Sequence, residues 1–314
     1  MLPRAIRPSL REYRTWTVNS RRLMAYRPRA DDIFISTYPK CGTTWMQHIV
    51  SMLVFRSPEP RSIHEVSLWP DTPIRGPIGP VMEKLEAQRH RRFIKVHLPL
   101  DGLPLYEGVK YVHVARDGRD ACMSWHNHQL AYTPYALAQL DRIGIDDCTL
   151  GRPFPRVSTD PRIFFRQWVT HGPDSPGLDF FDFEASCWSE RQRPNVLLVH
   201  YADLKSDLAG EMHRLADFLD IQISDVLWPE LIRAADFDAM RREGERLLPN
   251  ANDHFEGGAK RFLFKGTNGR WREALTDDDL ALYDTKVHDV FTPALAAWVE
   301  AGARVTGDPR ESAC

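Results

Sequence analysis

The run YPKCGTTW at positions 38–45 has the composition of an anion-binding loop. It lies between a short apolar run and an apolar segment with helical spacing, which places it at a strand-to-helix turn. Backbone N–H groups at the start of a helix bind anions, and the helix dipole favours negative charge there. Lys40 adds a positive charge, and the hydroxyls of Thr43 and Thr44 add donors. These residues predict a site for phosphate or sulfate.

The same run fits two common phosphate-handling motifs poorly. The G-x-x-x-x-G-K-[ST] loop has its Lys after the last Gly, whereas Lys40 precedes Gly42. Cys41 does not fit a phosphatase nucleophile, because the sixth residue after it is Gln47, where an Arg is needed to hold the anion. An ordinary helix start, with Thr caps and a turn set by Pro39, is the structural alternative.

Lys95 and His97 form a second candidate pair, at the end of the apolar run 93–96. Alternate residues of an extended chain project to one side, so these side chains would start about 6.6 Å apart. A neighbouring cation lowers the pKa of an imidazole and keeps it available as a base near neutral pH. The structural alternative is a polar residue that merely closes the end of a strand.

Arg116 is a third candidate, since it ends the apolar run 111–115 and its guanidinium can bind phosphate through two N–H groups. Asp117 suits the N-cap of a following helix, and Asp120 three residues later would complete a variant capping box. Arg119 is expected to be a surface charge.

Cys122, His126 and His128 follow on the same predicted helix. Residue 128 lies about 200° from residue 126 around such a helix, so the three side chains do not converge on a zinc ion. A place for His126 or His128 in the wall of an acceptor pocket is the other interpretation.

The segment 260–271, KRFLFKGTNGRW, is a further candidate anion site because it holds four cations and two Gly. Such density in a glycine-containing loop suits a phosphate, and a solvated basic surface is the alternative.

Together these segments resemble the cytosolic-type sulfotransferases, which transfer the sulfuryl group of 3′-phosphoadenosine 5′-phosphosulfate (PAPS) to a hydroxyl or amine. YPKCGTTW resembles the family's 5′-phosphosulfate loop, with Cys41 where Ser is usual, and 95–99 matches its K-x-H-L-P motif. The resemblance implies that His97 is the general base, and that Lys40 and Lys95 neutralise charge on the transferred group.

The resemblance also assigns the nucleotide contacts, with adenosine 3′,5′-bisphosphate (PAP) as product and no metal required. In the family an Arg and a Ser eight residues later bind the 3′-phosphate, and a later R-K-G-x-x-G-x-W motif closes over it. The implied donor-binding residues are Lys40, Cys41, Gly42, Thr43, Thr44, Trp45, Arg116, Ser124, Tyr201, Phe237, Lys265 and Gly266. Of these, Trp45, Tyr201 and Phe237 are on the adenine side.

Three departures from the family pattern stand out. Phe264 replaces the Arg that precedes Lys265, so Lys260, Arg261 or a residue elsewhere would supply the missing charge. Ala235 replaces a hydroxyl residue on the adenine side. The family's dimer motif is poorly kept around Arg272, which leaves a monomer or a homodimer.

The elements that must position these residues alternate along the chain. Strands are predicted at 33–37, 93–96, 111–115 and 196–200, helices at 43–55, 119–130, 164–168 and 204–219, and long loops at 57–80, 133–161 and 249–269. This alternation favours an α/β fold with a central parallel β-sheet flanked by helices. The family fold implied is a P-loop-like nucleotide-binding domain. We expect one domain over 1–314, with a lead-in over about 1–30 and a flexible tail over 305–314.

Composition excludes several classes of protein. Against 43 Asp+Glu stand 41 Lys+Arg, a formal charge of −2, so no overall field would hold nucleic acid. No apolar stretch approaches the roughly 20 residues of a membrane-spanning helix. Five scattered Cys form no disulfide framework, which favours a reduced, cytoplasmic location.

The acceptor is expected to be an apolar or aromatic small molecule or lipid carrying a hydroxyl. This expectation depends on aromatic residues in the long loops, namely Trp69, Tyr132, Tyr135, Phe154 and Phe255. Two other functions stay open: an atypical ATP-dependent kinase, which would need Mg²⁺, and a non-catalytic nucleotide-binding protein of the same fold.

Overall fold

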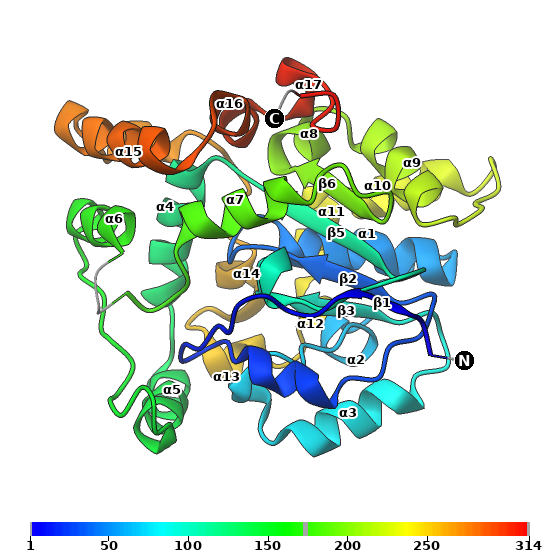
Figure 1. Cartoon of the computed structure of the whole chain (residues 1–314), viewed down its shortest axis with the longest axis horizontal. Coiled ribbons are helices and arrows are strands. Elements are labelled where there is room, and N and C mark those ends of the chain that lie inside the picture. Colours follow the sequence, from blue (N-terminus) through cyan, green and yellow to red (C-terminus); the bar gives the residue numbers. More distant parts are fainter. Residues whose placement is uncertain (1, 172–174, 313–314) are drawn as a thin grey trace.

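Four parallel strands form the central sheet of the computed structural model, which describes residues 2–171 and 175–312 (Figure 1). Their spatial order is β3 (Phe93–Val96), β2 (Ile33–Ser36), β5 (Lys110–Ala115) and β6 (Val196–His200). Ile33 lies opposite Phe93 on one side and Lys110 on the other, so the strands end at one edge. The predicted α/β fold is confirmed.

The sheet is buried on both faces, as continuous apolar strands require. Ile33 and Ile35 of β2 pack into one core cluster with α1 (Thr43–Phe55), α9 (Leu208–Phe218) and α10 (Trp228–Ala235). Phe34 packs into a second cluster on the opposite face, with helices α4, α6, α7, α15 and α16. The bounds of these helices are Gly118–Gln129, Pro161–Thr170, Phe180–Ser189, Asp277–Val290 and Pro293–Ala301.

The remaining elements complete the domain. The helices are α2 (Ile63–Val66), α3 (Ile78–Ala87), α5 (Pro134–Asp146), α8 (Tyr201–Ser206), α11 (Phe237–Arg242), α12 (Gly244–Leu247), α13 (Ala251–His254), α14 (Gly258–Phe262) and α17 (Ala303–Thr306). The 3₁₀ helices are η1 (Ser20–Ala25), η2 (Pro73–Arg75), η3 (Leu100–Gly102) and η4 (Arg270–Glu273), and β1 (Ala5–Arg7) pairs antiparallel with β4 (Leu105–Tyr106).

The strand predictions match the structure within one residue, whereas the loop predictions are partly wrong. Helix α5 occupies much of 133–161, because Thr133 accepts a hydrogen bond from the Ala136 N–H and Pro134 takes the first helical position. The segment 249–269 contains α13 and α14, and 57–80 contains α2. The predicted helix 204–219 is divided at Asp207, which ends α8 and caps α9.

The two ends of the chain pack against the domain. Trp16 and Val18 of the lead-in are buried, and near the other end the guanidinium of Arg310 donates to the Val196 carbonyl. One domain over 1–314 with a flexible tail over 305–314 stays a prediction, and the last residue, Cys314, lies outside the described residues. No helix in the described ranges combines the length and apolar character needed to cross a membrane.

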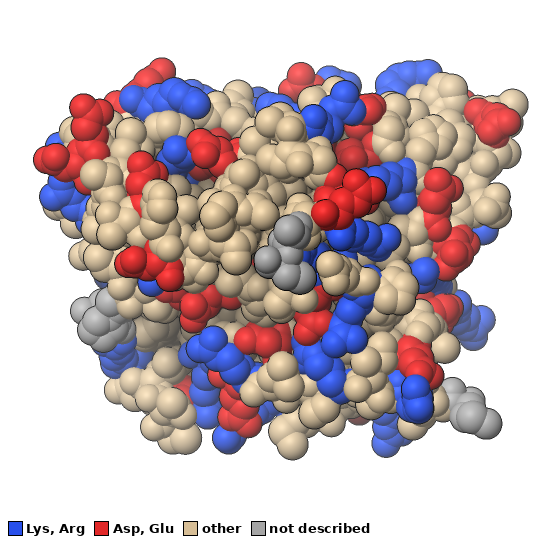
Figure 2. Space-filling view, turned by 45° about the horizontal axis from the view of Figure 1, so that its top comes forward, with Lys and Arg blue, Asp and Glu red and all other residues tan. Residues whose placement is uncertain are grey.

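Basic and acidic side chains are interspersed on the face shown in Figure 2, without a large patch of either sign. This distribution agrees with the formal charge of −2. This face therefore offers no extended basic surface for an anion.

One ion pair is fully enclosed at the start of the sheet. The Arg92 guanidinium donates to both carboxylate oxygens of Asp32, which also accepts from the Tyr26 hydroxyl and the Arg29 N–H, and neither Arg92 nor Asp32 is exposed. Removal of one partner leaves a buried charge without compensation.

The Arg92→Met substitution should lower the free energy of unfolding by about 3–5 kcal/mol, because the Asp32 carboxylate would lose its cation. Urea denaturation checks this. Arg4→Met is the matched control, since the Arg4–Glu107 pair is exposed and its loss should cost at most about 1 kcal/mol. Equal midpoints for the two variants would contradict the expectation.

Candidate active site

The loop between β2 and α1 has a backbone that few residues adopt. Lys40 has φ +72° and Gly42 has φ +112°, both in the left-handed region. A Cβ at position 42 would lie 3.0 Å from Cδ2 of Tyr201, so glycine serves both conformation and packing there. Gly42 is the N-cap of α1 and has no side chain to cap the helix, and no side chain of the described residues bonds to the first N–H groups. The turn therefore presents an open helix N-terminus, as an anion site requires.

Cys41 faces away from this site. Its side chain is fully buried in the core cluster on the other side of the loop, and burial raises the pKa of its thiol well above the ordinary value. The side chain therefore cannot contact a ligand, so Cys41 could reach an anion only through its backbone. The Thr43 hydroxyl is hydrogen-bonded to the hydroxyl of Thr37.

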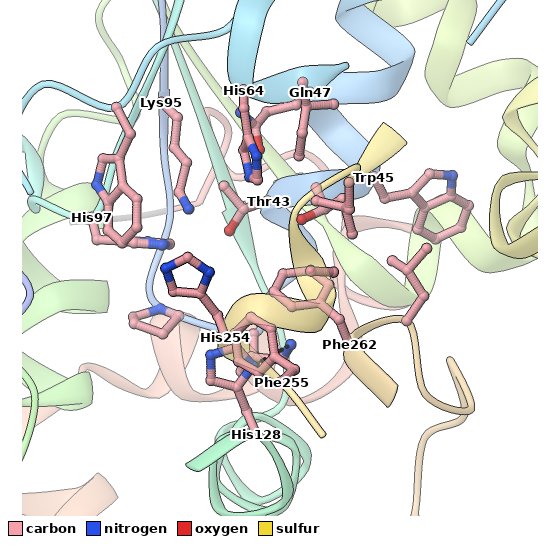
Figure 3. A pocket seen from close by; sticks show the side chains of 18 of the residues that line it. Thr43, Trp45, Gln47, His64, Lys95, His97, His128, His254, Phe255 and Phe262 are labelled. Carbon is pink, nitrogen blue, oxygen red and sulfur yellow. Dashed lines mark hydrogen bonds between the residues drawn. The ribbon is translucent and has the colours of Figure 1, made fainter. Parts of the chain in front are cut away.

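A cavity of about 740 Å³ opens at this edge of the sheet (Figure 3). It brings together the sequence-predicted site residues other than Cys41. The residues so placed in its lining are Lys40, Gly42, Thr43, Thr44, Trp45, Lys95, His97, Arg116, Ser124, Tyr201, Phe237, Lys265 and Gly266.

The tautomer of His97 is fixed by its surroundings. Its Nδ1 lies 2.7 Å from the Thr37 carbonyl oxygen, which can only accept, so Nδ1 carries the proton and Nε2 has a free lone pair. The backbone N–H of His97 donates to Oδ2 of buried Asp71 at 2.9 Å. Burial lowers the pKa of His97 well below its usual value, helped by Lys95 and Lys40. The imidazole is therefore neutral and able to take a proton.

Lys95 reaches the same cavity beside His97. Its Nζ lies 3.6 Å from the centroid of the Trp69 ring, and that ring meets the His97 ring edge to face at 5.1 Å between centroids. Burial, followed by the charge of Arg75, lowers the pKa of Lys95 to about 7.

Lys40 lies at the other side of the cavity. Its Nζ is 4.4 Å from the centroid of the Phe262 ring and 3.4 Å from Nδ1 of His128. Burial lowers the pKa of Lys40 to about 7, with further contributions from Arg116 and Arg270. Within the described part of the chain, neither Lys40 nor Lys95 forms a salt bridge with a carboxylate. Both ammonium groups are thus left for an anionic ligand.

Arg116 connects the loop to the C-terminal basic segment. Its guanidinium donates to the Lys40 carbonyl at 3.2 Å, and to the Thr267 carbonyl and Asn268 Oδ1 at 2.9 Å each. It also lies 4.3 Å from the centroid of the Tyr201 ring. These hydrogen-bond partners are all neutral, and the nearby Asp120 carboxylate, whose pKa burial raises and the charge of Arg116 lowers, is hydrogen-bonded to the Gly269 N–H instead.

The capping prediction at the start of α4 is half right. Asp117 caps the helix by accepting from the Arg119 N–H at 2.8 Å. Asp120 does not complete a capping box, because its carboxylate accepts instead from the Gly269 N–H at 2.8 Å. The prediction of Arg119 as a surface charge is wrong, since it is buried and pairs with Asp117 and Glu300.

The basic segment supplies two guanidinium groups around Phe264. Arg261 and Arg270 each have Cζ 5.2 Å from the centroid of its ring, and both line the cavity, whereas Lys260 does not. Arg270 was missed in the sequence because it occupies a variable position of the basic motif. The lowering of the Lys40 pKa by its charge places Arg270 near the phosphate loop.

An aromatic corner lies behind the loop. The Trp45 indole donates to the Ala235 carbonyl at 2.6 Å and meets Tyr201 and Phe237 at centroid distances of 5.5 and 6.2 Å. Phe237 packs on Gly266, where any Cβ would come within 2.5 Å of its ring. The corner offers apolar faces for a planar base.

The opposite part of the cavity bears out only some of the predicted acceptor residues. Trp69, Tyr132 and Phe255 line it, but Tyr135 is exposed and Phe154 packs in a small separate cluster with Trp16. Tyr135 points from α5 to solvent, and Phe154, which follows α5 in the chain, packs in the cluster of Trp16 and Leu140, so neither ring lines the cavity. The sequence did not single out four polar residues that also line the cavity, namely His64, Arg75, Gln88 and His254.

The side chains of Cys122, His126 and His128 lie in three different environments. Cys122 is buried in the core, His126 contacts the Ser158 carbonyl at 2.8 Å through Nε2, and His128 lines the cavity. Among residues 2–171 and 175–312, no three metal-binding side chains cluster.

Comparisons with known proteins identify relatives of this chain. A glycolipid sulfotransferase of Mycobacterium bovis (strain BCG / Pasteur 1173P2) is 35% identical over 311 residues, covering 93% of this chain and 94% of the relative. Sulfotransferase 1A1 of Rattus norvegicus is 26% identical over 259 residues, covering 78% and 79%.

Solved structures share the fold at lower sequence identity. The mouse sulfotransferase SULT7A1 complexed with PAP has a TM-score of 0.66 at 20% identity, over 88% of this chain and 90% of that chain. Retinol dehydratase in a complex with retinol and PAP also has a TM-score of 0.66 at 20% identity, over 87% of this chain and 86% of that chain.

The family model of the sulfotransferase domain matches residues 30–298. The chain therefore belongs to the sulfotransferase domain family and is a sulfotransferase.

Proposed function

We propose that this sulfotransferase transfers the sulfuryl group of PAPS to a hydroxyl of an amphiphilic acceptor, a small molecule or lipid. The observation that carries the proposal is the free Nε2 of His97 in a cavity shared with Lys40 and Lys95, next to an open helix N-terminus. A base and two ammonium groups around an anion cradle suit transfer of an anionic group to a hydroxyl.

In the proposed reaction, His97 Nε2 takes the proton of the acceptor hydroxyl while its oxygen attacks sulfur. The bond from sulfur to the bridging oxygen breaks, and PAP leaves with that electron pair. Lys40 and the N–H groups of α1 stabilise negative charge on the leaving phosphate, and Lys95 does so on the sulfuryl oxygens. All of these residues line one cavity, which supports a role in orientation as well as in charge stabilisation.

Arg116, Ser124, Lys265 and Gly266 would hold the 3′-phosphate, and the aromatic corner would hold the adenine. Two similar structures contain PAP, which supports a donor of this class. The glycolipid sulfotransferases at 35% identity support a lipid-linked acceptor. Trp69, Tyr132 and Phe255 supply apolar surface for such a molecule.

The wild-type protein should transfer radiolabelled sulfate from PAPS to an acceptor, and His97→Gln should lower kcat by about 10²-fold or more through loss of the base. The readout is labelled product over a panel of phenols, sterols, alkanols and glycosides. The affinity of the variant for PAP, measured by thermal-shift titration, should change less than twofold, because His97 is not among the proposed nucleotide contacts.

Near wild-type kcat in His97→Gln, with PAP still bound, would exclude His97 as the base. Stabilisation by ATP and Mg²⁺ but not by PAP would favour the kinase alternative. Stabilisation by PAP without transfer to any acceptor would favour a binding protein.

Arg270→Ala should weaken PAP binding about tenfold or more, because Arg270 lies near Arg116, and a charge-assisted contact to the 3′-phosphate proposed there would be lost. The affinity for adenosine 5′-monophosphate, which lacks that phosphate, should fall less than twofold in the same variant. Lys260→Ala is the matched control, since Lys260 is a cation of the same segment outside the cavity lining. Calorimetric titration measures the affinities, and an equal loss for the two nucleotides would place Arg270 elsewhere.

The affinity for PAP should fall as pH rises above 7. The pKa of Lys40 is lowered to about 7, so the ammonium is charged below that pH and neutral above it. An anion that needs the charged form should bind about fivefold less tightly at pH 8 than at pH 7. Lys40→Arg keeps its charge across this range and should flatten the profile, so an unchanged slope in this variant would contradict the assignment.

A further inference from the structure

A loop segment closes the open edge of the central sheet beside Lys95 and His97. β3 is an edge strand, so the N–H groups on its outer side have no neighbouring strand to bind them. The segment 68–71 supplies the acceptors instead. The Leu68 carbonyl accepts from the Lys95 N–H at 2.9 Å, and the Asp71 carboxylate accepts from the His97 N–H at 2.9 Å. This segment therefore fixes the backbone from which both side chains enter the same side of the cavity (Figure 3).

The loop that carries Asp71 is restrained by its own sequence and by the start of the chain. The run WPDTP at 69–73 contains two prolines, each with a fixed φ, which limits the shapes the loop can take. The Asp71 carbonyl accepts from the Asn19 N–H at 2.7 Å, and the Pro70 carbonyl accepts from Arg22 Nε at 2.8 Å. The position of the Asp71 carboxylate behind His97 is thus well defined.

The charge of Asp71 is not needed for its hydrogen bond to His97. The side chain is fully buried, and its second oxygen, Oδ1, has no partner among the described residues. Burial raises the pKa of this carboxyl to about 7, although the His97 N–H and the charges of Lys95 and Arg22 lower it. A neutral amide would accept from the same N–H at a smaller cost, since a buried charge is more unfavourable than a buried polar group. The carboxylate therefore calls for a role beyond the hydrogen bond.

We propose that Asp71 is a positioning residue for sulfuryl transfer, which holds His97 at the end of β3 and favours the ammonium form of Lys95 through its negative charge. The inference rests on the proposed function, in which His97 is the base and Lys95 stabilises the sulfuryl oxygens. Asp71 is not part of the cavity lining, so it acts through these two residues and not by contact with a ligand.

The surroundings of Lys95 explain why a carboxylate is useful there. Burial and the charge of Arg75 lower the pKa of Lys95, Asp71 raises it, and Lys40 lowers it further. The other titratable groups that the charge of Lys95 affects are imidazoles whose pKa values are lowered chiefly by burial, namely those of His64, His97 and His128. These imidazoles are neutral, so Asp71 is the group that opposes the nearby cations.

Asp71 supplies this charge without occupying the ammonium group. Its Oδ2 accepts from the His97 N–H, its Oδ1 has no partner in the described structure, and Lys95 Nζ lies over the Trp69 ring. A salt bridge would have to break before the ammonium could bind a sulfuryl oxygen. A carboxylate beyond contact distance avoids this cost, because interactions between buried charges are only weakly screened.

Asp71→Asn tests the role of the charge, because the amide still offers an acceptor to the His97 N–H. The pKa of Lys95 is measured without any ligand, by NMR titration of protein labelled with ¹³C at the lysine Cε atoms, and Lys95→Arg assigns the signal. In Asp71→Asn the pKa of Lys95 should fall by about 0.5–1 pH unit relative to the wild type. A purely structural role for Asp71 would leave this titration where it is.

The kinetic test follows kcat against pH at saturating PAPS, with the best acceptor of the panel. Activity that needs the Lys95 ammonium is lost as pH rises through the pKa of that group. The alkaline limb of Asp71→Asn should therefore move to lower pH, with kcat about three- to tenfold lower at a fixed pH on that limb. The pH dependence of PAP affinity should not change, because the pKa of Lys40 is set by burial and by other charges.

Asp71→Ala removes the acceptor as well as the charge. It should show the same displaced limb and, in addition, a plateau of kcat about threefold or more below that of Asp71→Asn, since the His97 N–H is left without a partner. The asparagine variant should melt at the same or a higher temperature than the wild type at pH 8. The pKa of Asp71 is raised to about 7, so its ionised form costs stability above that pH.

Asp203→Asn is the matched control. Asp203 is also a buried carboxylate that accepts from a backbone N–H, that of Ala303 at 2.7 Å, but it lies outside the cavity lining and is not among the groups that shift the pKa of Lys95. The pKa of Lys95 and the alkaline limb should be unchanged in this variant.

An unchanged pKa of Lys95 in Asp71→Asn, or an equal change in Asp203→Asn, would overturn the proposal. A lowered melting temperature together with an unchanged pKa of Lys95 would leave Asp71 a structural role only. Failure of the proposed function has a different signature, namely no stabilisation by PAP or no transfer of labelled sulfate by the wild type. The titration of Lys95 needs neither donor nor turnover, so the two failures can be told apart.

Discussion

The site depends on one buried guanidinium that holds three segments together. Arg116 directly follows β5. It donates to the Lys40 carbonyl in the loop between β2 and α1, here called the phosphate loop, and to Thr267 O and Asn268 Oδ1 of the basic segment. These segments are more than 70 positions from Arg116 on one side and about 150 on the other, so no local preference could bring them together. Because its hydrogen-bond partners are neutral, Arg116 organises the cavity wall and keeps its positive charge for a ligand.

Burial and mutual repulsion make the charged forms of the cavity lysines unfavourable, and a bound anion would offset this cost. Lys40 and Lys95 are crowded by other cations, and burial removes the water that would stabilise their charge. This is why both pKa values are lowered to about 7. An enzyme that binds a multiply charged nucleotide gains from such an arrangement, since the ligand supplies the missing counter-charge. Burial, with the charges of Lys95 and Lys40, also keeps His97 neutral, so the cations that would serve an anion help to keep the proposed base unprotonated.

The sequence predicted the parts of the site that follow directly from a strand. The phosphate loop, the pair Lys95 and His97, and Arg116 each lie where a buried strand ends, and parallel strands end at one edge. Two positive φ values at Lys40 and Gly42 turn that loop into a helix start, and glycine at position 42 was a readable sign of it.

The rest depends on long-range packing, which no local pattern reports. Arg270 enters the site because its segment folds over α4, and Gln88 because the end of α3 packs on α2. Tyr135 and Phe154 have the same residue types as Tyr132 and Phe255, yet of the four only Tyr132 and Phe255 line the cavity. Residue type could not separate these pairs, since each ring is equally apolar.

The burial of Cys41 has a consequence for the chemistry of the loop. A thiol that is fully enclosed and protonated reacts slowly with oxidants and alkylating reagents, so the phosphate loop is insensitive to redox conditions although it contains a cysteine. Cys122 and Cys187 are enclosed as well, whereas Cys148 is exposed just after α5. Among the cysteines that the structure describes, Cys148 is the one at which a fluorophore could be attached, beside helix α5, which lines part of the cavity.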